Sequence, residues 1–344
     1  MTRARRPKLR DPIITLAHGA GGKATSALVE GLFLEELGSP LLEALGDSAV
    51  IELNGSRFAF TTDSYVVTPI FFPGGSIGEL AVNGTVNDLA VAGARPRYLS
   101  AGFVVEEGFP VADLRRVAAA MGRAAAAAGV TIAAGDTKVV ERGKADGLYV
   151  NTAGVGEIPD GVALGPERVQ PGDRVIVSGT LGDHGMAVMI ARGGLELEVD
   201  LVSDTAPVHE LVASLLRLGP AVRWMRDPTR GGLATALNEL TAQAQVAVRL
   251  REDALPIRRA VAGACEILGI DPLYVACEGR LVAIVAGDAA EAALAGLRAH
   301  PLGAEAADVG EIGADPPGLV LLDTAFGGSR IVDMLVGDPL PRIC

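Results

Sequence analysis

The sequence is poor in aromatic residues and cysteine, and it contains no long hydrophobic run. Aromatic side chains make up 4% of the 344 residues, and the three cysteines fit neither a disulfide framework nor a cysteine metal site. No stretch approaches the roughly 20 consecutive apolar residues that span a bilayer. These features favour a protein of a reducing cytoplasm that does not act on or in a membrane.

Positive charge is also scarce, because 30 Lys and Arg residues face 42 Asp and Glu residues and give a net charge of −12. A negative protein repels a phosphate backbone, so nucleic acid is excluded as the main partner. Hydrophobic residues make up 49% and charged residues 21%, which excludes wholesale disorder. Glycine is the excess, with 44 residues, roughly twice the usual ~7% share. Many tight turns and close backbone approaches are therefore expected.

The length suggests two domains, and segments typical of strands and helices alternate along the chain. This mixture predicts an α/β or α+β fold. The proline-containing stretch 157–173 has little periodicity and marks the expected boundary. The predicted parts are a basic disordered extension over 1–12, an N-terminal domain over 13–158, a C-terminal α/β domain over 170–335 and a mobile tail over 336–344.

Hydrophobic periodicity predicts the elements of the N-terminal domain. Asn54-Gly55 between two apolar runs predicts a hairpin, and Gly129 is expected to end the helix before it. The expected strands are 13–16, 49–53, 57–62, 130–134 and 148–155, and the expected helices are 24–37, 77–92 and 111–128.

A glycine-rich loop, His18-Gly-Ala-Gly-Gly-Lys23, stands at a predicted strand-to-helix junction. The Walker A pattern fails, because Ala24 follows Lys23 and the first glycine is misplaced. The dinucleotide-binding spacing is formally met, but a hairpin follows where a second parallel strand is needed. Backbone N–H groups at Gly21 and Gly22 could still bind phosphate at the start of the helix. A simple tight turn would explain the same loop.

Several aspartates stand at predicted strand ends or inside an apolar helix. Mg²⁺ prefers oxygen ligands and often bridges carboxylates to nucleotide phosphates, so these residues could form a metal site if the fold brings them together. Each of them could also be an ordinary cap or turn residue. Asn83, Asn87 and Asp88 are harder to explain in that way, because an apolar helix keeps polar groups where they are hydrogen-bonded or functional. The four candidates are Asp47, Asp63, Asp88 and Asp136.

Further charged residues lie in glycine-rich turns. Lys138 follows Asp136 closely, and its ammonium group could stabilise a transferring phosphate or act on a carboxamide oxygen. A structural ion pair is the alternative for Lys138. Two strand–turn–helix motifs that contain His184 and Arg230 could present backbone N–H groups and charge to an anion between the domains, or could be ordinary turns. Glu278 precedes a predicted strand in a similar position.

The chain given ends in a cysteine, Cys344. Its position excludes prenylation, which needs a cysteine four residues from the end. Pro339 and Pro341 favour an extended segment without internal hydrogen bonds. A thiol at the end of such a tail suits a carrier that accepts a group and delivers it to an active site, and an inert exposed thiol is the alternative. Cys265 and Cys277 are expected to be core thiols.

Eight motifs together carry a family resemblance, and they are 18–23, 60–65, 71–75, 84–89, 135–139, 178–185, 227–232 and the terminal Pro341-Arg-Ile-Cys344. They resemble the HypE family, the carbamoyl dehydratases of [NiFe]-hydrogenase maturation, within the aminoimidazole-ribonucleotide synthetase superfamily. The resemblance covers essentially everything after residue 13. The terminal motif is the most specific, because the others alone would indicate only the superfamily, which also includes selenophosphate synthetase and thiamine-monophosphate kinase.

The resemblance implies a two-domain α/β (α+β) fold whose N-terminal domain forms a sheet or barrel, binds ATP and makes a homodimer. It implies that a carbamoyltransferase, HypF, loads a carboxamide onto the sulfur of Cys344. The tail would then enter the interdomain ATP site, where ATP-driven dehydration leaves a thiocyanate. The cyanide would pass to iron on a HypC–HypD complex.

The resemblance also implies roles for individual residues. The implied ligands of Mg²⁺ are Asp47, Asp63, Asp88 and Asp136. The implied catalytic residues are Cys344, Lys138, Glu278 and Asp88. The implied ATP-binding residues are His18, Gly21, Gly22, Lys23, Thr62, Asn83, Asn87, Asp136, Asn151 and Arg230. Two other functions stay open, namely phosphate transfer to a free small molecule, which would not need the cysteine tail, and a non-catalytic maturation scaffold, which would not hydrolyse ATP.

Overall fold

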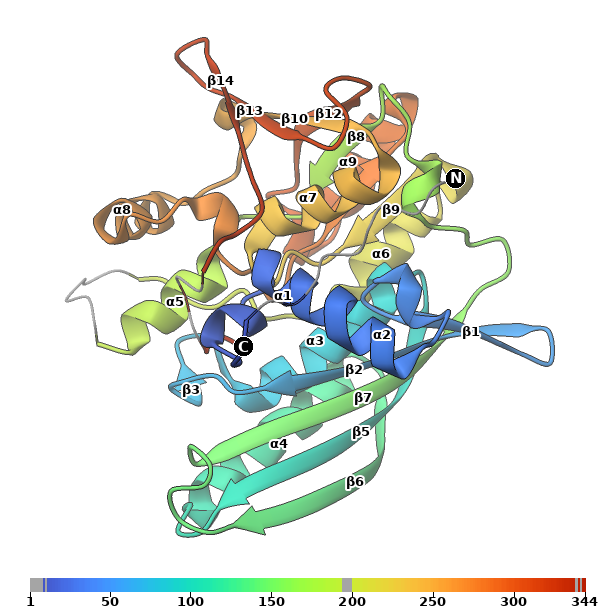
Figure 1. The fold of residues 1–344 in the computed structure, drawn as a ribbon. Coiled ribbons are helices and arrows are strands. Elements are labelled where there is room, and N and C mark those ends of the chain that lie inside the picture. Colours follow the sequence, from blue (N-terminus) through green and yellow to red (C-terminus); the bar gives the residue numbers. More distant parts are fainter. Residues whose placement is uncertain (1–8, 10, 194–199, 338–339, 341) are drawn as a thin grey trace.

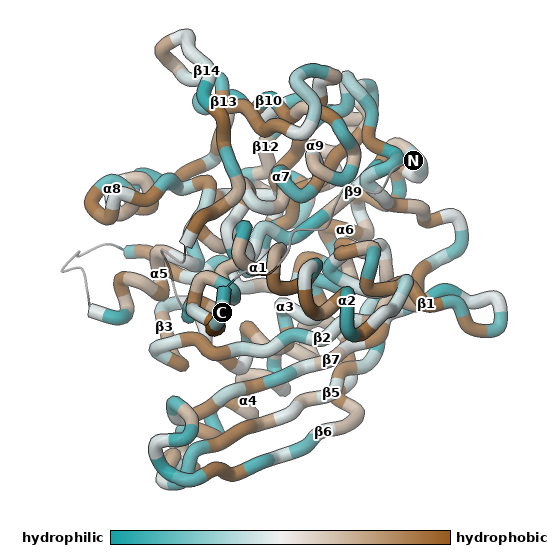
Figure 2. Tube along the Cα trace, viewed as in Figure 1, coloured by the Kyte–Doolittle hydropathy of each residue, from teal (hydrophilic) through white to brown (hydrophobic). Residues whose placement is uncertain are grey.

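The computed structural model describes residues 9, 11–193, 200–337, 340 and 342–344 (Figure 1). The predicted basic extension over 1–12 falls almost entirely outside these residues, as does part of the tail over 336–344. Two separate sheets organise the remainder, one in each half of the chain. Hydrophobic and hydrophilic residues are mixed along the chain (Figure 2). Among the described residues, no helix combines the length and the apolar character needed to cross a membrane.

The N-terminal half forms a five-stranded sheet, whose strands are, in spatial order, β1 (Ala49–Leu53), β2 (Ser56–Tyr65), β7 (Leu148–Ile158), β5 (Arg95–Glu106) and β6 (Thr131–Val140). Neighbouring strands are antiparallel, except that β5 and β6 are parallel and are joined by helix α4 (Val111–Ala127). Helix α3 (Ile77–Val91) and α4 cover one face of this sheet (Figure 1). A short ribbon, β3 (Phe71–Phe72) and β4 (Gly75–Ser76), precedes α3.

The C-terminal half forms a seven-stranded sheet, in the order β14 (Ser329–Ile331), β13 (Val320–Asp323), β10 (Ala247–Arg251), β12 (Ala307–Gly313), β8 (Arg174–Val177), β11 (Val282–Val285) and β9 (Val222–Arg226). Only β10 and β13 pair in parallel among these neighbours. Every residue of β11 is buried, which explains its uninterrupted apolar sequence. The helices of this half are α5 (Asp183–Ala191), α6 (His209–Leu216), α7 (Gly232–Ala244), α8 (Arg259–Leu268) and α9 (Ala290–Arg298).

Helix α3 belongs to the cores of both halves. Its sequence is apolar on all sides, as expected for a helix without a solvent-facing stripe, and almost all of its residues are buried. Leu80 and Leu89 pack in the core of the N-terminal half, whereas Ala90 and Val91 pack with residues of α6 and β11. The helix therefore fixes the position of one domain against the other.

The predicted strand over 13–16 is wrong. Residues Leu16–Gly19 form a 3-10 helix, and Ile13 and Ile14 are exposed without a neighbouring strand among the described residues. The predicted helix over 24–37 is confirmed as a continuous helical stretch, made of α1 (Lys23–Leu28), one π-helical turn and α2 (Leu34–Leu37). The strands β2 and β6 also extend further than expected, because their backbone pairing continues through the polar residues that follow the apolar runs.

Candidate active site

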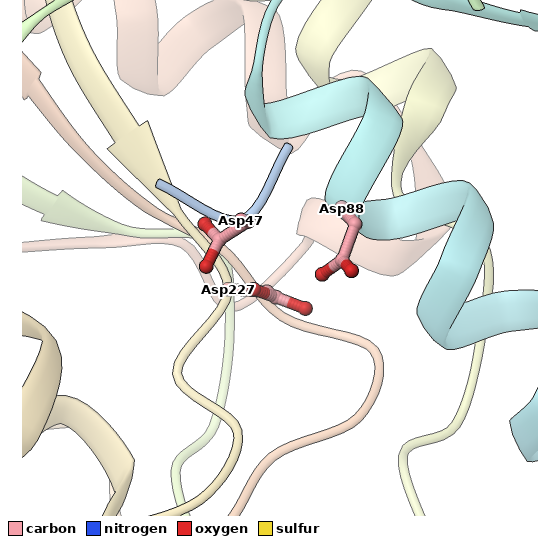
Figure 3. Close-up of side chains that lie close together, drawn as sticks. All are labelled: Asp47, Asp88 and Asp227. Carbon is pink, nitrogen blue, oxygen red and sulfur yellow. The ribbon is translucent and has the colours of Figure 1, made fainter. Parts of the chain in front are cut away.

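Three carboxylates from separate elements meet at the junction of the two domains (Figure 3). Asp47 precedes β1, Asp88 lies near the end of α3, and Asp227 directly follows β9. One oxygen from each of these side chains lies within 4.8 Å of the others. We call this group the acidic cluster. Asp47 and Asp88 were predicted as metal ligands, whereas Asp227 was not.

Neighbouring side chains fix the orientation of the acidic cluster. The hydroxyl of Thr61 lies 2.8 Å from Asp88 Oδ2 and 2.7 Å from the backbone carbonyl of Asp47. The guanidinium of Arg226 lies 2.9 Å from Asp47 Oδ1 and 2.8 Å from Glu239 Oε2. Asp88 and Asp47 are therefore held in place by side chains from strand β2, strand β9 and helix α7.

The electrostatics of the acidic cluster favour binding of a cation. Burial and the neighbouring carboxylates of Asp227, Asp47 and Asp63 raise the pKa of Asp88 well above its usual range. Burial likewise raises the pKa of Asp47 and of Asp227, although Arg226 opposes the shift in both. Removing several carboxylates from water against mutual repulsion is unfavourable unless a positive charge compensates them. An all-oxygen donor set of this kind suits a hard divalent cation such as Mg²⁺.

Arg230 lines two cavities, and the first of them also borders the acidic cluster. The first has a volume of about 280 Å³ and is lined by the acidic cluster together with Asp63. The second has a volume of about 90 Å³ and is lined by Tyr274 and Cys344. Arg230 Nη2 lies 3.7 Å from Asp63 Oδ1, and the negative charge of Cys344 raises the pKa of Arg230. Arg230 thus connects the acidic cavity to the end of the chain.

Glu278 is a buried carboxyl group whose charge interacts with those of Asp227, Asp63 and Arg230. It is 3% exposed, and its Oε1 has no hydrogen-bond partner among the described residues. Burial, then the charges of Asp227 and Asp63, raise the pKa of Glu278 well above its usual range, and Arg230 opposes this shift. A buried carboxyl that is short of partners is a candidate for proton transfer.

The described residues of the tail are docked on the protein. The Val66 N–H donates to the Cys344 carbonyl (3.0 Å), and the Thr68 N–H donates to the Arg342 carbonyl (3.2 Å). Ile343 is buried in a hydrophobic cluster to which residues of both halves contribute. The end of the chain therefore lies against the segment that follows β2, with Cys344 at the second cavity.

The residues of the predicted phosphate-binding loop already have partners. The Gly21 N–H donates to Thr25 Oγ1 (2.9 Å), and the Lys23 N–H donates to the Leu335 carbonyl (3.0 Å). Lys23 Nζ lies 2.6 Å from Asp333 Oδ2. Gly22 lacks a side chain where Leu335 approaches its backbone, and the buried His18 bonds to Thr15 through Nδ1. In this conformation the loop therefore joins the C-terminal half more than it opens toward a phosphate.

The two asparagines of α3 also face the C-terminal half. The side-chain amide of Asn87 donates to the carbonyls of Ala206 and Glu278, and its Oδ1 accepts from the Val208 N–H. Asn83 donates to Thr205 Oγ1 (3.2 Å). The side chain of Asn87 is thus fully bonded, which explains its place in an apolar helix, whereas Asn83 Oδ1 is buried without a hydrogen-bond partner among the described residues.

Four predicted residues lie on the exposed face of the N-terminal sheet, which is the face that α3 and α4 do not cover (Figure 1). Strand pairing aligns Ser64 with Asn151, Asn151 with Gly102, and Gly102 with Asp136, so Asp136 lies three strands from β2, about 14 Å at the usual strand spacing. It therefore does not join the acidic cluster of its own chain. Its carboxylate pairs with Lys138 Nζ at 3.2 Å, and both side chains are 71% exposed. The four residues of this face are Thr62, Asn151, Asp136 and Lys138. Of these, Thr62 also lines the cavity that holds the acidic cluster.

Asp227 is the functional candidate that sequence reasoning missed. The Asp227-Pro-Thr-Arg motif indicates a turn, which was expected to offer backbone N–H groups. The sequence did contain a signal for Asp227, because it directly follows an apolar run that predicts a strand. Asp63 was chosen as a candidate ligand for the same reason.

Family models match the chain over two regions. The N-terminal domain of AIR synthase-related proteins matches residues 45–158, and the C-terminal domain of the same proteins matches residues 170–321. The mixed α/β architecture described above agrees with these two domains.

Full-length relatives and solved structures are also similar to the chain. It is 55% identical to carbamoyl dehydratase HypE of Bradyrhizobium diazoefficiens, over 99% of each chain, and 47% identical to carbamoyl dehydratase HypE of Escherichia coli K12, over 96% of this chain and 99% of the other. A crystal structure of hydrogenase maturation protein HypE in complex with ATP superposes with a TM-score of 0.81 at 48% identity, covering 96% of this chain and 100% of the other. A HypE–HypF complex matches with a TM-score of 0.86 at 45% identity, over 90% and 100% of the two chains.

Proposed function

The chain belongs to the AIR synthase-related family and, within it, to the HypE carbamoyl dehydratases, and we propose that its substrate is a carboxamide on its own Cys344. The protein is an ATP-dependent carbamoyl dehydratase with a role in hydrogenase maturation. The observation that carries the proposal is the docked tail, which brings Cys344 to the cavity that shares Arg230 with the acidic cavity. A free small-molecule substrate would leave this arrangement of the tail unexplained.

The proposed reaction converts an S-carboxamide into a thiocyanate. The carboxamide oxygen attacks the γ-phosphorus of ATP, which releases ADP and leaves a phosphorylated imidate on the sulfur. The oxygen then departs with phosphate, the nitrogen loses both of its protons in the course of the two steps, and S–C≡N is left. Such chemistry depends mainly on positioning and on electrostatic stabilisation of phosphate charge.

The acidic cluster is the proposed site for Mg²⁺. Its three carboxylates fit the ion because they supply hard oxygen donors whose repulsion a cation relieves. Bound there, Mg²⁺ would neutralise phosphate charge. Asp63 adds negative charge beside the cluster, and Arg226 and Thr61 hold the ligands in place.

Arg230 and Glu278 are the proposed groups of this chain closest to the reaction. Arg230 interacts with the charges of both Cys344 and Glu278, so it can orient the end of the tail and stabilise negative charge near it. Its raised pKa gives Glu278 a higher proton affinity than an exposed glutamate has, which suits removal of a proton from the carboxamide nitrogen.

We further propose that a second copy of the chain covers the exposed face of the N-terminal sheet. Phe60 is 45% exposed and Tyr98 is 55% exposed on that face, and β6 is an edge strand whose residues are nearly all exposed. Asp136 and Lys138 lie there too, away from the acidic cluster of their own chain. In a homodimer they would serve the ATP site of the other copy.

The remaining partners follow from the chemistry. HypF is the proposed donor of the carboxamide, and a HypC–HypD complex is the proposed acceptor of the cyanide. None of the three cysteines forms a disulfide among the described residues, and Cys344 has to stay reduced to accept the carboxamide, so we propose that the protein works in the reducing cytoplasm.

Intact mass spectrometry tests the proposed reaction. After incubation with HypF, carbamoyl phosphate and ATP, the protein should gain the mass of one carboxamide and then lose one water. Asp88→Asn should keep the first change and lose the second. A Cys344→Ala variant that still underwent the mass changes would refute the mechanism.

Subunit mixing tests the proposed dimer. At a Mg²⁺ concentration that just saturates the wild type, Lys138→Ala and Asp227→Asn proteins should each lose water much more slowly than the wild type. A reassorted mixture should regain part of the activity, because some mixed dimers then hold one complete site. No recovery in a mixture shown to contain mixed dimers would place Lys138 in the site of its own chain or outside it.

A further inference from the structure

The last three residues of the chain lie along residues 66–68, and two of the contacts join main-chain atoms of both segments, while Arg342 Nε donates to the Val66 carbonyl at 3.3 Å. The Val66 N–H donates to the Cys344 carbonyl at 3.0 Å, and the Thr68 N–H donates to the Arg342 carbonyl at 3.2 Å. The two segments therefore run in opposite directions with alternate residues bonded, although Arg342 has a left-handed backbone (φ +58°) and neither segment is a regular strand. Main-chain hydrogen bonds fix which residues of the tail lie beside residues 66–68, and they do not involve the side chain of Cys344.

The carbonyl between these two, that of Ile343, is bound from the other side by His184. His184 Nε2 lies 2.6 Å from the Ile343 oxygen, and the imidazole is completely buried. Its second nitrogen, Nδ1, lies 2.8 Å from Ser203 Oγ. The edge of the ring also meets Phe72, with the two ring centroids 5.5 Å apart, which fixes the plane of the imidazole.

The tautomer of His184 follows from its partners. A carbonyl oxygen can only accept, so Nε2 has to carry the proton, and Nδ1 has to accept from the Ser203 hydroxyl. Ser203 Oγ in turn accepts from the Thr205 N–H at 3.1 Å, which leaves its own hydrogen available for Nδ1. Burial lowers the pKa of His184 to about 4, so the ring is neutral at physiological pH and carries one N–H.

Arg192 completes the set of donors. Its Nη2 donates to the Arg342 carbonyl, and its Nε donates to the Thr68 carbonyl at 2.6 Å. One guanidinium therefore bridges the tail and the segment against which the tail lies. Together these groups give each of the last three carbonyls of the chain at least one donor.

From this geometry we infer that His184 is a positioning residue of the dehydration, and that with Arg192 and the N–H groups of Val66 and Thr68 it forms a seat for the tail. The inference rests on the proposed function only for the reaction that the seat serves. Because the seat bonds the main chain alone, it holds the tail whether or not the thiol of Cys344 carries a carboxamide. Ile343 fills a buried site at the same time, which leaves Cys344 directed to the cavity beside Arg230.

Hydrogen exchange of the amides in residues 66–68, followed by mass spectrometry of the full-length protein, tests the seat without ATP or carbamoyl phosphate. In the His184→Ala variant these amides should exchange about tenfold faster, the effect of one lost net hydrogen bond on the docked population. His184→Gln, whose side chain can still donate, should recover most of the protection. A matched control is His300→Gln, since His300 also lies in the C-terminal half but bonds to Glu210 at the surface.

A truncation separates loss of the seat from general destabilisation. In a chain that lacks residues 343–344, His184→Ala should cause no further acceleration, because its bonding partner has already been removed. Unchanged exchange in His184→Ala, or an equal further acceleration in the truncated chain, would overturn the proposal.

The same variants measured in the dehydration assay connect the seat to the reaction. His184→Ala should load a carboxamide normally and lose water roughly tenfold more slowly, and His184→Gln should be faster than alanine. If wild-type protein never loses water, the proposed function fails while the exchange result stands by itself. If wild type loses water and His184→Ala is equally fast, the positioning role fails alone.

Discussion

Replacing Asn87 with alanine tests whether this residue joins the two domains or binds ATP. Its side-chain amide donates to the carbonyls of Ala206 (3.1 Å) and Glu278 (3.0 Å), and its Oδ1 accepts from the Val208 N–H (2.8 Å). All three partners belong to the C-terminal half, and Asn87 is only 1% exposed. Alanine would leave two carbonyl oxygens and one N–H group without these partners in a region closed to solvent.

The size of the effect follows from those three groups. A buried polar group that loses its partner costs about 1–3 kcal/mol, and the three costs overlap because relaxation and entry of water can serve neighbouring groups together. We therefore expect the free energy of unfolding to fall by about 3–5 kcal/mol. Asn83→Ala is the matched control, because Asn83 lies one turn earlier and makes a single 3.2 Å bond to Thr205, so its loss should cost about 1 kcal/mol.

Urea unfolding and ATP binding, measured separately, decide the question. Trp224, the single tryptophan, lies in β9 and is 7% exposed, so its fluorescence reports unfolding of the C-terminal half. Asn87→Ala should unfold at a clearly lower urea concentration than Asn83→Ala, while its folded form still binds ATP. An unchanged urea midpoint together with lost ATP binding would refute the assignment of Asn87 to the domain junction.

Three further changes test other parts of the structure. Asp227→Asn should raise the Mg²⁺ concentration for half-maximal ATP hydrolysis by roughly tenfold, or about 1.4 kcal/mol of ion binding, and an unchanged Mg²⁺ dependence would remove Asp227 from the metal site. Burial lowers the pKa of His184 to about 4, so the neutral ring contributes fully to stability above pH 6.5. As the pH falls, the unfolded chain takes up a proton before the folded one does, and stability should drop by up to roughly 3 kcal/mol near pH 4. Urea midpoints measured across this range should show this drop in the wild type, and His184→Gln should abolish it. Gly22→Ala would place a methyl group against the Leu335 carbonyl and should lower the melting temperature, by about 1–3 kcal/mol of stability, whereas Gly19→Ala, with open space around it, should not.

Local sequence patterns were sufficient where neighbouring residues decide the structure. The hairpin at Asn54-Gly55 and the end of α4 at Gly129, whose φ is +66°, were confirmed because each depends on a residue that tolerates left-handed backbone. The strand expected over 13–16 failed because a strand needs a partner, and Ile13 and Ile14 have none among the described residues. Apolar character alone does not reveal that difference.

The site was only partly predictable for a related reason. Asp47 and Asp88 stood out in their local context, and the structure brings them together with Asp227. Asp227 comes from the other half of the chain, and its place depends on how β9 docks beside α3, a long-range contact that no local pattern encodes. The position of Asp136 depends on the order and register of strands in the sheet, which the sequence motif does not reveal.

If Cys344 carries the reacting carboxamide, as proposed above, the docked tail has a kinetic consequence. A reacting group attached to the chain that converts it has no concentration of its own, so the rate of conversion per molecule should not change on dilution. Its local concentration is set by the length of the tether and is of millimolar order for short flexible chains. A soluble compound that imitates the carboxamide would have to exceed that value to compete. In the proposed cycle each chain also converts one group and then has to be emptied by an acceptor before it can react again. Unloading of Cys344, and not affinity for a substrate, should then limit how often the cycle can repeat.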